Sequence, residues 1–137
     1  MNRTLYVLDG KEPRRASSVL EWMHWYANAD RTVALTRIDE MDVSTVFIGI
    51  DHEYSPHGVR YDGEPMLFET AVFATTTARV VRAFRHPTWA EAERAHAFIV
   101  GCLLDAICRR RLDPNQAIDE AHQRWLQHGV SEHGNAS

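Results

Sequence analysis

Acidic and imidazole side chains come together at one point of the sequence, Asp51-His52-Glu53. An imidazole between carboxylates is the combination that proteins use for acid–base catalysis and for holding metal ions. His57 follows in a segment with turn residues, and Glu69 lies further along in a segment with the pattern of a strand. One hypothesis is therefore a hydrolase-type or metal-dependent enzyme with a site around Asp51, His52, His57 and Glu69.

The spacing of these residues argues against that site. Successive residues of a strand point to opposite faces, so the side chains of Asp51 and His52 diverge on a regular strand. The expected strand pairing places Glu69 about 13 Å from His52, and the zinc-type spacings HExxH and CxxC do not occur in the sequence. We therefore expect no metal, no cofactor and a solvated strand end, with Glu69 in an ion pair with Arg85.

The elements that would position these residues follow from the periodicity of the sequence. Residues 4–8 predict a first strand, and residues 11–16 predict a loop because they contain a proline and polar residues. Ser18 and Glu21 have the spacing of a capping box, and apolar residues recur after them at helical intervals, which predicts a helix over residues 18–29.

The middle of the chain has the pattern of an antiparallel meander. Its β-branched and apolar runs are separated by short polar turns, which predicts hairpins between strands at residues 32–39, 43–52, 65–74 and 78–85. If each hairpin is symmetric about its turn, Thr36 lies opposite Thr45, Gly49 opposite Phe68, and Glu69 opposite Ala83 and diagonal to Arg85.

The last third of the sequence changes to a helical period. Thr88 precedes an apolar stripe that includes His96 and predicts a long helix. Asp113-Pro114 starts a further helix that we expect to stop at Gly129. The prediction is an α+β fold, a four- to five-stranded antiparallel sheet packed by the long C-terminal helix, with an N-terminal helix and a further C-terminal helix. Residues 1–130 would form one domain and residues 131–137 a disordered tail.

The predicted sheet has two different faces. One is almost continuously aliphatic, and we expect the helix that starts at Thr88 to cover it; its residues are Val33, Leu35, Val46, Ile48, Ile50, Leu67, Ala71, Phe73, Val81 and Ala83. The other face is half polar and half aromatic. Its candidate protein-binding residues are Phe47, Phe68, Phe84, Thr45 and Thr70. Two interpretations stay open for this aromatic stripe: cover by a helix of the same chain, or contact with a partner or a second copy.

Four sequence segments resemble a family of small proteins encoded by bacteriophages and prophages. The longest are STVFIGIDH at residues 44–52 and LFETAVF at residues 67–73, and YVLDG at 6–10 and TWAEAERAH at 88–96 add to the likeness. No activity is known for that family. The resemblance therefore implies a phage or prophage origin and supplies no functional residues.

Charge and composition narrow the class of partner. The net charge is −4, and residues 39–69 hold eight acidic residues and one arginine, so nucleic acid is not the expected partner. Arg109-Arg110-Arg111 suits the C-terminal end of a helix. No apolar run approaches the ~20 residues needed to cross a bilayer, and there is no signal-peptide pattern, so we expect the cytoplasm of a bacterial host.

The function that these observations favour is that of a small phage or prophage accessory protein that binds another protein without catalysis. Inhibition of a host or defence protein would be one such role, and the partner would be a host or phage protein. Homodimerisation through the aromatic stripe is the related alternative, and the enzyme around Asp51, His52, His57 and Glu69 is the competing one.

Overall fold

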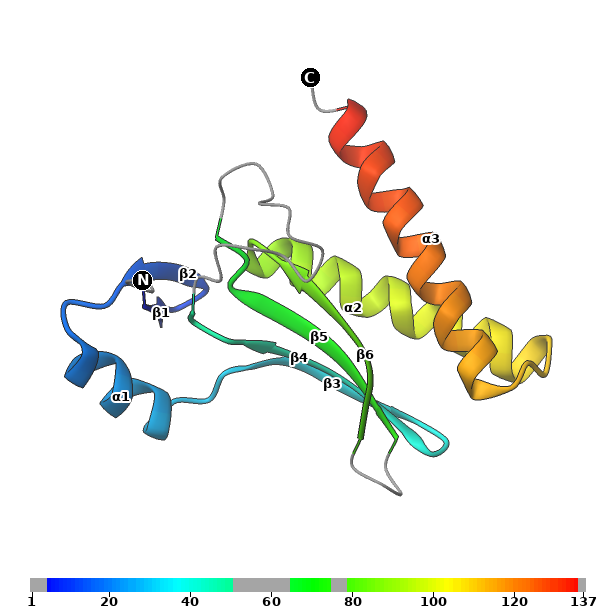
Figure 1. The fold of residues 1–137 in the computed structure, drawn as a ribbon, viewed down its shortest axis with the longest axis horizontal. Helices are drawn as coiled ribbons and strands as arrows, with labels where there is room; N and C mark the ends of the chain where they lie inside the picture. Colours follow the sequence, from blue (N-terminus) through cyan, green and yellow to red (C-terminus); the bar gives the residue numbers. More distant parts are fainter. Residues whose placement is uncertain (1–4, 51–64, 75–78, 136–137) are drawn as a thin grey trace.

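A computed structural model describes residues 5–50, 65–74 and 79–135 (Figure 1). The chain forms two antiparallel sheets and three helices. In order, the elements are β1 (Tyr6–Asp9), β2 (Glu12–Arg15), α1 (Val19–Asn28), β3 (Thr32–Ile38), β4 (Met41–Phe47), β5 (Phe68–Ala74), β6 (Arg79–His86), α2 (Trp89–Leu104), a π-helical turn (Asp105–Arg109) and α3 (Pro114–Asn135). The predicted α+β class is confirmed.

All three helices begin where the sequence predicts. The Ser18 hydroxyl accepts a hydrogen bond from the Glu21 backbone N–H at 3.0 Å, and the Thr88 hydroxyl accepts one from the Glu91 backbone N–H at 3.1 Å. These contacts satisfy donors that the first helical turn leaves free. Pro114 is the first residue of α3, a position at which the missing N–H of proline is not needed.

Two segments differ from the sequence-based expectation. Residues 12–15 form β2, which pairs with β1 and places Pro13 opposite Leu8, although a loop was expected. Proline is tolerated there because an edge strand has no further strand to bond. Helix α3 continues to Asn135, past the expected stop at Gly129, so residues 131–135 are helical instead of a disordered tail. One glycine costs a helix only about 1 kcal/mol.

The larger sheet has the predicted meander order, β3-β4-β5-β6. Each hairpin is shifted by two residues from the expected register, so that Thr36 lies opposite Val43, Phe47 opposite Phe68, and Glu69 opposite Arg85. In the first hairpin the predicted pairs were wrong because the turn is shorter than expected, with Ile38 paired to Met41 and Asp39 at a positive φ of 50°. A shift of two residues keeps side chains on their predicted faces where the strands are regular. Val33, at an irregularity in β3, and Leu67, just before β5, were expected on the aliphatic face but pack with Phe47 on the covered face.

Helix α2 covers the opposite face of the sheet from the one predicted. It packs on the face of Thr45 and Phe47, while Leu35 on the aliphatic face is 65% exposed. The prediction chose the more aliphatic face. It missed that His96, in the middle of the apolar stripe of α2, needs polar partners once buried, and only the mixed face has the threonines to supply them.

The buried side chains form two clusters on this covered face. The larger lies between the sheet, α2 and the first half of α3, and includes Val43, Val72, Ile99, Leu103 and Ile118. The smaller contains Phe47, Leu67, Phe68 and Ala92, and the half-buried Trp25 of α1 packs against it. In Figure 1, α2 crosses the sheet while α3 turns away from it towards the C-terminus.

Candidate functional site

Helix α1 is attached to the rest of the protein by one side that carries its aromatic residues. The Trp25 ring meets the Phe47 ring edge-on at a centroid distance of 5.5 Å. Trp22 and Tyr26 contact each other at 4.6 Å. The Arg31 guanidinium lies over the Tyr26 ring at 3.7 Å and donates to the Phe47 carbonyl at 3.1 Å. These contacts hold the helix against the end of β4.

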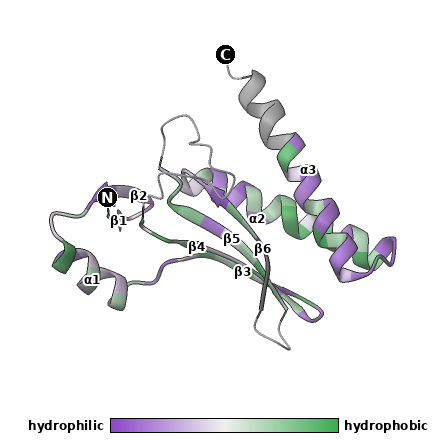
Figure 2. Cartoon of the chain, viewed as in Figure 1, coloured by the Kyte–Doolittle hydropathy of each residue, from purple (hydrophilic) through white to green (hydrophobic). Residues whose placement is uncertain are grey.

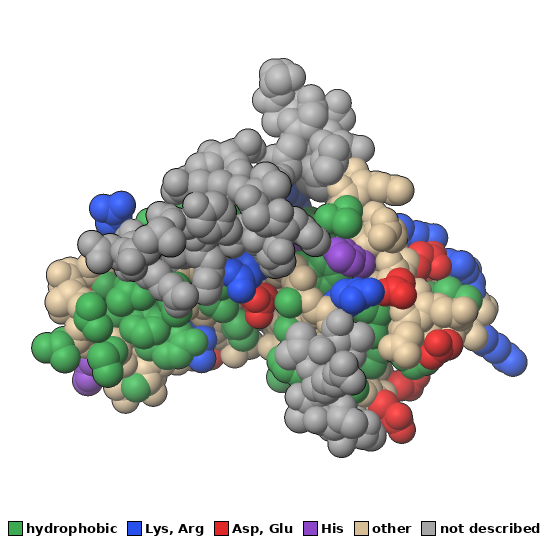
Figure 3. Space-filling view, viewed as in Figure 1, with side chains coloured by type: hydrophobic (Ala, Val, Ile, Leu, Met, Phe, Trp, Pro, Cys, Tyr) green, Lys and Arg blue, Asp and Glu red, His purple; other side chains and the backbone are tan. Residues whose placement is uncertain are grey.

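The other side of α1 is apolar and open. Leu20 is 77% exposed, Val19 61% and Met23 55%, and none of the residues of the helix is buried. Figure 2 shows hydrophobic colouring along much of α1, and Figure 3 shows hydrophobic side chains gathered over it. Isolated exposed apolar residues are ordinary, but a group of large ones on one helix marks an interaction surface.

A close backbone approach at Gly49 lets α1 sit where it does. Gly49 has a φ of +69°, and a Cβ atom there would come within 2.7 Å of the Tyr6 carbonyl oxygen and 3.1 Å of the Trp22 Nε1 atom. Only glycine fits this conformation and this space without strain. The Tyr6 N–H also bonds the Gly49 carbonyl at 2.8 Å, so Gly49 joins β1, the end of β4 and α1.

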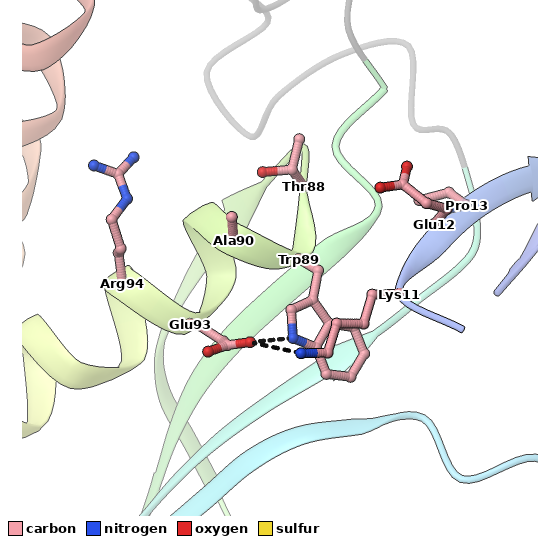
Figure 4. Close-up of a pocket in the computed structure, with 8 residues that line it drawn as sticks. All are labelled: Lys11, Glu12, Pro13, Thr88, Trp89, Ala90, Glu93 and Arg94. Carbon is pink, nitrogen blue, oxygen red and sulfur yellow. Dashed lines mark hydrogen bonds and ion pairs between the residues drawn. The ribbon is translucent and has the colours of Figure 1, made fainter. Parts of the chain in front are cut away.

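A cleft of about 560 Å³ lies between the β1–β2 hairpin and the first turns of α2 (Figure 4). Glu93 is one of the residues that line it, and its carboxylate accepts a hydrogen bond from the Trp89 indole N–H and lies 3.8 Å from the Lys11 ammonium. The same ammonium lies 5.7 Å from the centre of the Trp89 ring. Because these charges pair with one another, this part of the cleft wall has no unbalanced charge that would select a ligand.

A continuous chain of buried hydrogen bonds crosses the covered face of the sheet. His96 bonds Thr36 through Nε2 at 2.9 Å and Thr45 through Nδ1 at 2.8 Å. Thr45 bonds Thr70 at 2.7 Å, and Thr70 bonds His86 Nε2 at 3.0 Å. One residue from each strand of the sheet and one from α2 therefore take part.

The two imidazoles in this chain of hydrogen bonds, those of His86 and His96, are neutral at pH 7. Burial lowers the pKa of His86 from its usual 6.5 to about 4, and burial also lowers the pKa of His96. With neutral rings the donors and acceptors along these hydrogen bonds can be matched, because each hydroxyl and each neutral imidazole can donate one hydrogen bond and accept another. The arrangement fixes α2 on the sheet.

The aromatic stripe that the sequence suggested as a binding surface is part of the core. Phe47, Phe68 and Phe84 are buried, and so are Thr45 and Thr70. Helices α2 and α3 of the same chain cover them: Ala92 packs against Phe47 and Phe68, and the His122 ring meets the Phe84 ring at 5.0 Å. Of the two interpretations, cover by the chain's own helices is the one that the structure supports.

The alternative polar site is described at only one of its four residues. Asp51, His52 and His57 lie outside the described residues. Glu69 lies opposite Arg85 on the uncovered face of the sheet, and their side chains form an ion pair at 3.3 Å. The predicted pairing of these two residues is confirmed. In the described part of the chain, no group of three or more His, Cys, Asp or Glu side chains could hold a metal ion.

We expect the Glu69–Arg85 pair to contribute measurably to stability. Both side chains are three-quarters buried, and directly opposed charges on neighbouring strands are worth about 0.5–1 kcal/mol. A double-mutant cycle with Glu69→Ala and Arg85→Ala in urea denaturation should show that coupling, and it should shrink in 1 M salt. A coupling energy of zero at low salt would show that the pair is not formed in solution.

The arginines at the end of α2 are used within the protein. Arg109 lies 3.6 Å from the Asp105 carboxylate, and Arg110 forms an ion pair with Glu120 of α3. The first contact lies within the π-helical turn, and the second joins the end of that turn to α3. They agree with a structural role for the Arg109–Arg111 run.

Comparisons with known proteins add no relative to this picture. No protein-family model, curated protein or solved structure matches the chain. In the described helices, none is long and apolar enough to cross a membrane.

Helix α1 is a candidate surface that was not predicted from the sequence. Leu20, Met23 and Ala27 follow helical spacing, and this spacing was interpreted only as evidence for a helix. The available signal was the excess of large apolar residues: Trp22, Trp25 and Tyr26 already supply one side, so Leu20 and Met23 must occupy another.

Proposed function

We propose that this protein acts by binding another protein through the exposed apolar side of α1. The observation that supports the proposal is that the two sides of the helix differ. Its aromatic side anchors it to the rest of the protein, whereas the large apolar side chains of its other side are exposed: Val19, Leu20 and Met23. A helix presented in this way is rigid before binding, which reduces the entropy lost on association.

The shape and charge of α1 favour a groove on the partner. Leu20, Met23 and Ala27 follow the i, i+3, i+7 spacing of helices that bind in apolar grooves. A ten-residue helix is about 15 Å long, so two such helices lying side by side bury far less than the ~1,200 Å² of a stable interface. A groove that encloses both flanks of the helix buries more of it.

Electrostatics also point to an uncharged groove. Glu21 is the only charged residue of α1, and its carboxylate is bonded to Arg14 at 3.3 Å and to the Ser17 N–H at 2.7 Å. The pKa of Glu21 is lowered by these contacts, the bond from Ser17 first. The exposed side of the helix therefore offers a partner apolar contacts and no free charge.

The resemblance to phage and prophage proteins suggests the class of partner. We infer a host or phage protein in the cytoplasm of a bacterial host, bound without catalysis. The enzyme alternative gains no support from Glu69, the one described residue of its site, because that carboxylate is paired with Arg85.

Substitution of Leu20 tests this function. Wild type, Leu20→Asp and Leu126→Asp are immobilised and exposed to the same bacterial lysate; Leu126, 48% exposed on α3, is the matched control. A protein retained by wild type and by the control, but not by Leu20→Asp, is then purified and titrated by calorimetry. We expect one-to-one binding that Leu20→Asp weakens at least about tenfold, the effect of losing one apolar anchor.

Two results would contradict the proposal. One is that the wild-type bait retains no protein that binds it again after purification. The other is equal affinity of that protein for wild type and Leu20→Asp. Because Leu20 is already exposed, unchanged circular dichroism of the variant should show that a loss of binding is not a loss of folding.

A further inference from the structure

The two edges of the larger sheet are protected to very different degrees. Strand β6 carries three arginines in its eight residues, RVVRAFRH, and β3 carries one in seven, TVALTRI. Charges along an edge strand deter pairing with another strand. Helix α2 packs on the face of β3, where His96 bonds Thr36. In the described part of the chain, the strand order leaves the outer side of β3 without a neighbouring strand, so β3 is the less charged of the two edges.

Backbone groups of β3 point out of this edge at every second residue. Ile38 and Met41 are paired across a two-residue turn, and such a flanking pair exchanges both of its hydrogen bonds. The alternation along an antiparallel ladder then directs Thr36 towards β4 and directs Leu35 and Arg37 away from it. The free N–H and C=O groups of Leu35 lie at the centre of the exposed edge.

The side chains of β3 are compatible with a second copy of the same strand. Leu35 is 65% exposed on the uncovered face of the sheet. In an antiparallel pair centred on Leu35, each Leu35 meets its own copy and each Arg37 lies near the uncharged Val33 of the partner subunit, at the irregularity of β3, so like charges are not opposed. Arg37 is also neutralised within its own chain by Asp42, at 2.9 Å.

We propose that two copies of the protein associate through β3, antiparallel and with Leu35 opposite Leu35 of the partner subunit, so that their two sheets become continuous. The occupant is a second copy because this register opposes no like charges and places the exposed Leu35 against its own copy on the two-fold axis. This association uses a different surface from α1 and does not depend on the function proposed above.

Charge substitutions at Leu35 test both the surface and the register. Light scattering on wild type over a range of concentrations should show the mass rising towards twice the chain mass of 15.7 kDa. Leu35→Lys alone and Leu35→Glu alone should stay monomeric, because each places like charges opposite each other. An equimolar mixture of the two should recover the dimer, because opposite charges then meet.

Two control variants separate this proposal from others. Leu126→Lys, on α3, and Leu20→Asp, on α1, should leave the mass of the wild-type dimer unchanged. The proposal is overturned by a wild type that stays at 15.7 kDa at every concentration, by a Leu35→Lys variant that dimerises as wild type does, or by a mixture that stays monomeric. Circular dichroism on the single variants checks that each is folded, as expected for an exposed position.

Discussion

Replacing Phe47 by aspartate is expected to unfold the protein. Phe47 is fully buried, and its ring lies edge-on to Phe68 at 5.1 Å and to Trp25 at 5.5 Å. The change removes a large apolar side chain and buries a carboxylate with no partner. Together these cost about 5 kcal/mol or more, which is comparable with the whole stability of an ordinary domain.

Far-UV circular dichroism and thermal unfolding measure the result, with Leu20→Asp as the control. Leu20 is exposed, so the same new charge there should change the free energy of unfolding by no more than about 0.5 kcal/mol. A Phe47→Asp variant that folds cooperatively would show that α2 does not cover this face of the sheet. The aromatic stripe would then return as a candidate binding surface.

Acidification is expected to destabilise the protein before its carboxylates titrate. The pKa of His86 is about 4 in the folded protein and near 6.5 in the unfolded chain, so the unfolded state binds the proton more tightly. Stability is therefore complete above pH 6.5 and decreases as the pH falls from 6.5 towards 4. His86 alone contributes a loss of about 2 kcal/mol between pH 7 and pH 5.

His96 acts in the same direction, since burial lowers its pKa as well. The carboxylates of Glu21, Asp42 and Glu120 have lowered pKa values because each accepts hydrogen bonds, and they lose their contribution only at more acidic pH. A change in the free energy of unfolding between pH 7 and pH 5 therefore reports the protonation of the buried histidines.

Urea denaturation at pH 7, 6 and 5 measures this effect. A His86→Gln variant keeps an amide that can bond Thr70 but has no proton to gain, so its stability should depend less on pH than that of wild type. His24→Gln, at an exposed position of α1, is the control and should keep the full dependence. Equal pH dependence of wild type and His86→Gln would show that His86 is not buried as described.

Sequence features that depend on contacts between residues close in the chain gave correct predictions. Ser18, Thr88 and Pro114 mark the helix starts because a cap is a contact between near neighbours. The two faces of the sheet were predicted correctly within the regular strands, because side chains alternate along a strand regardless of register, but not at Val33 and Leu67, where the alternation is interrupted. The pairing of Glu69 with Arg85 was reached through the same alternation.

What the sequence could not decide was which elements meet across the molecule. Both faces of the sheet carry enough apolar side chains to be buried, and the choice between them depends on the hydrogen-bond partners of one residue of α2, His96. The open side of α1 was hidden for a similar reason, because its apolar spacing does not show which side packs. Asp51, His52 and His57 stay a hypothesis, since they lie outside the described residues.

Hydrogen–deuterium exchange of the protein with and without its purified partner tests the proposed function most directly. Exchange reports the opening of backbone hydrogen bonds, and a groove that encloses α1 should slow it. The account predicts slower exchange across Val19–Asn28 and unchanged exchange in β4, β5 and α2. Slower exchange in another element, with α1 unaffected, would contradict the claim that the exposed side of α1 is the binding surface.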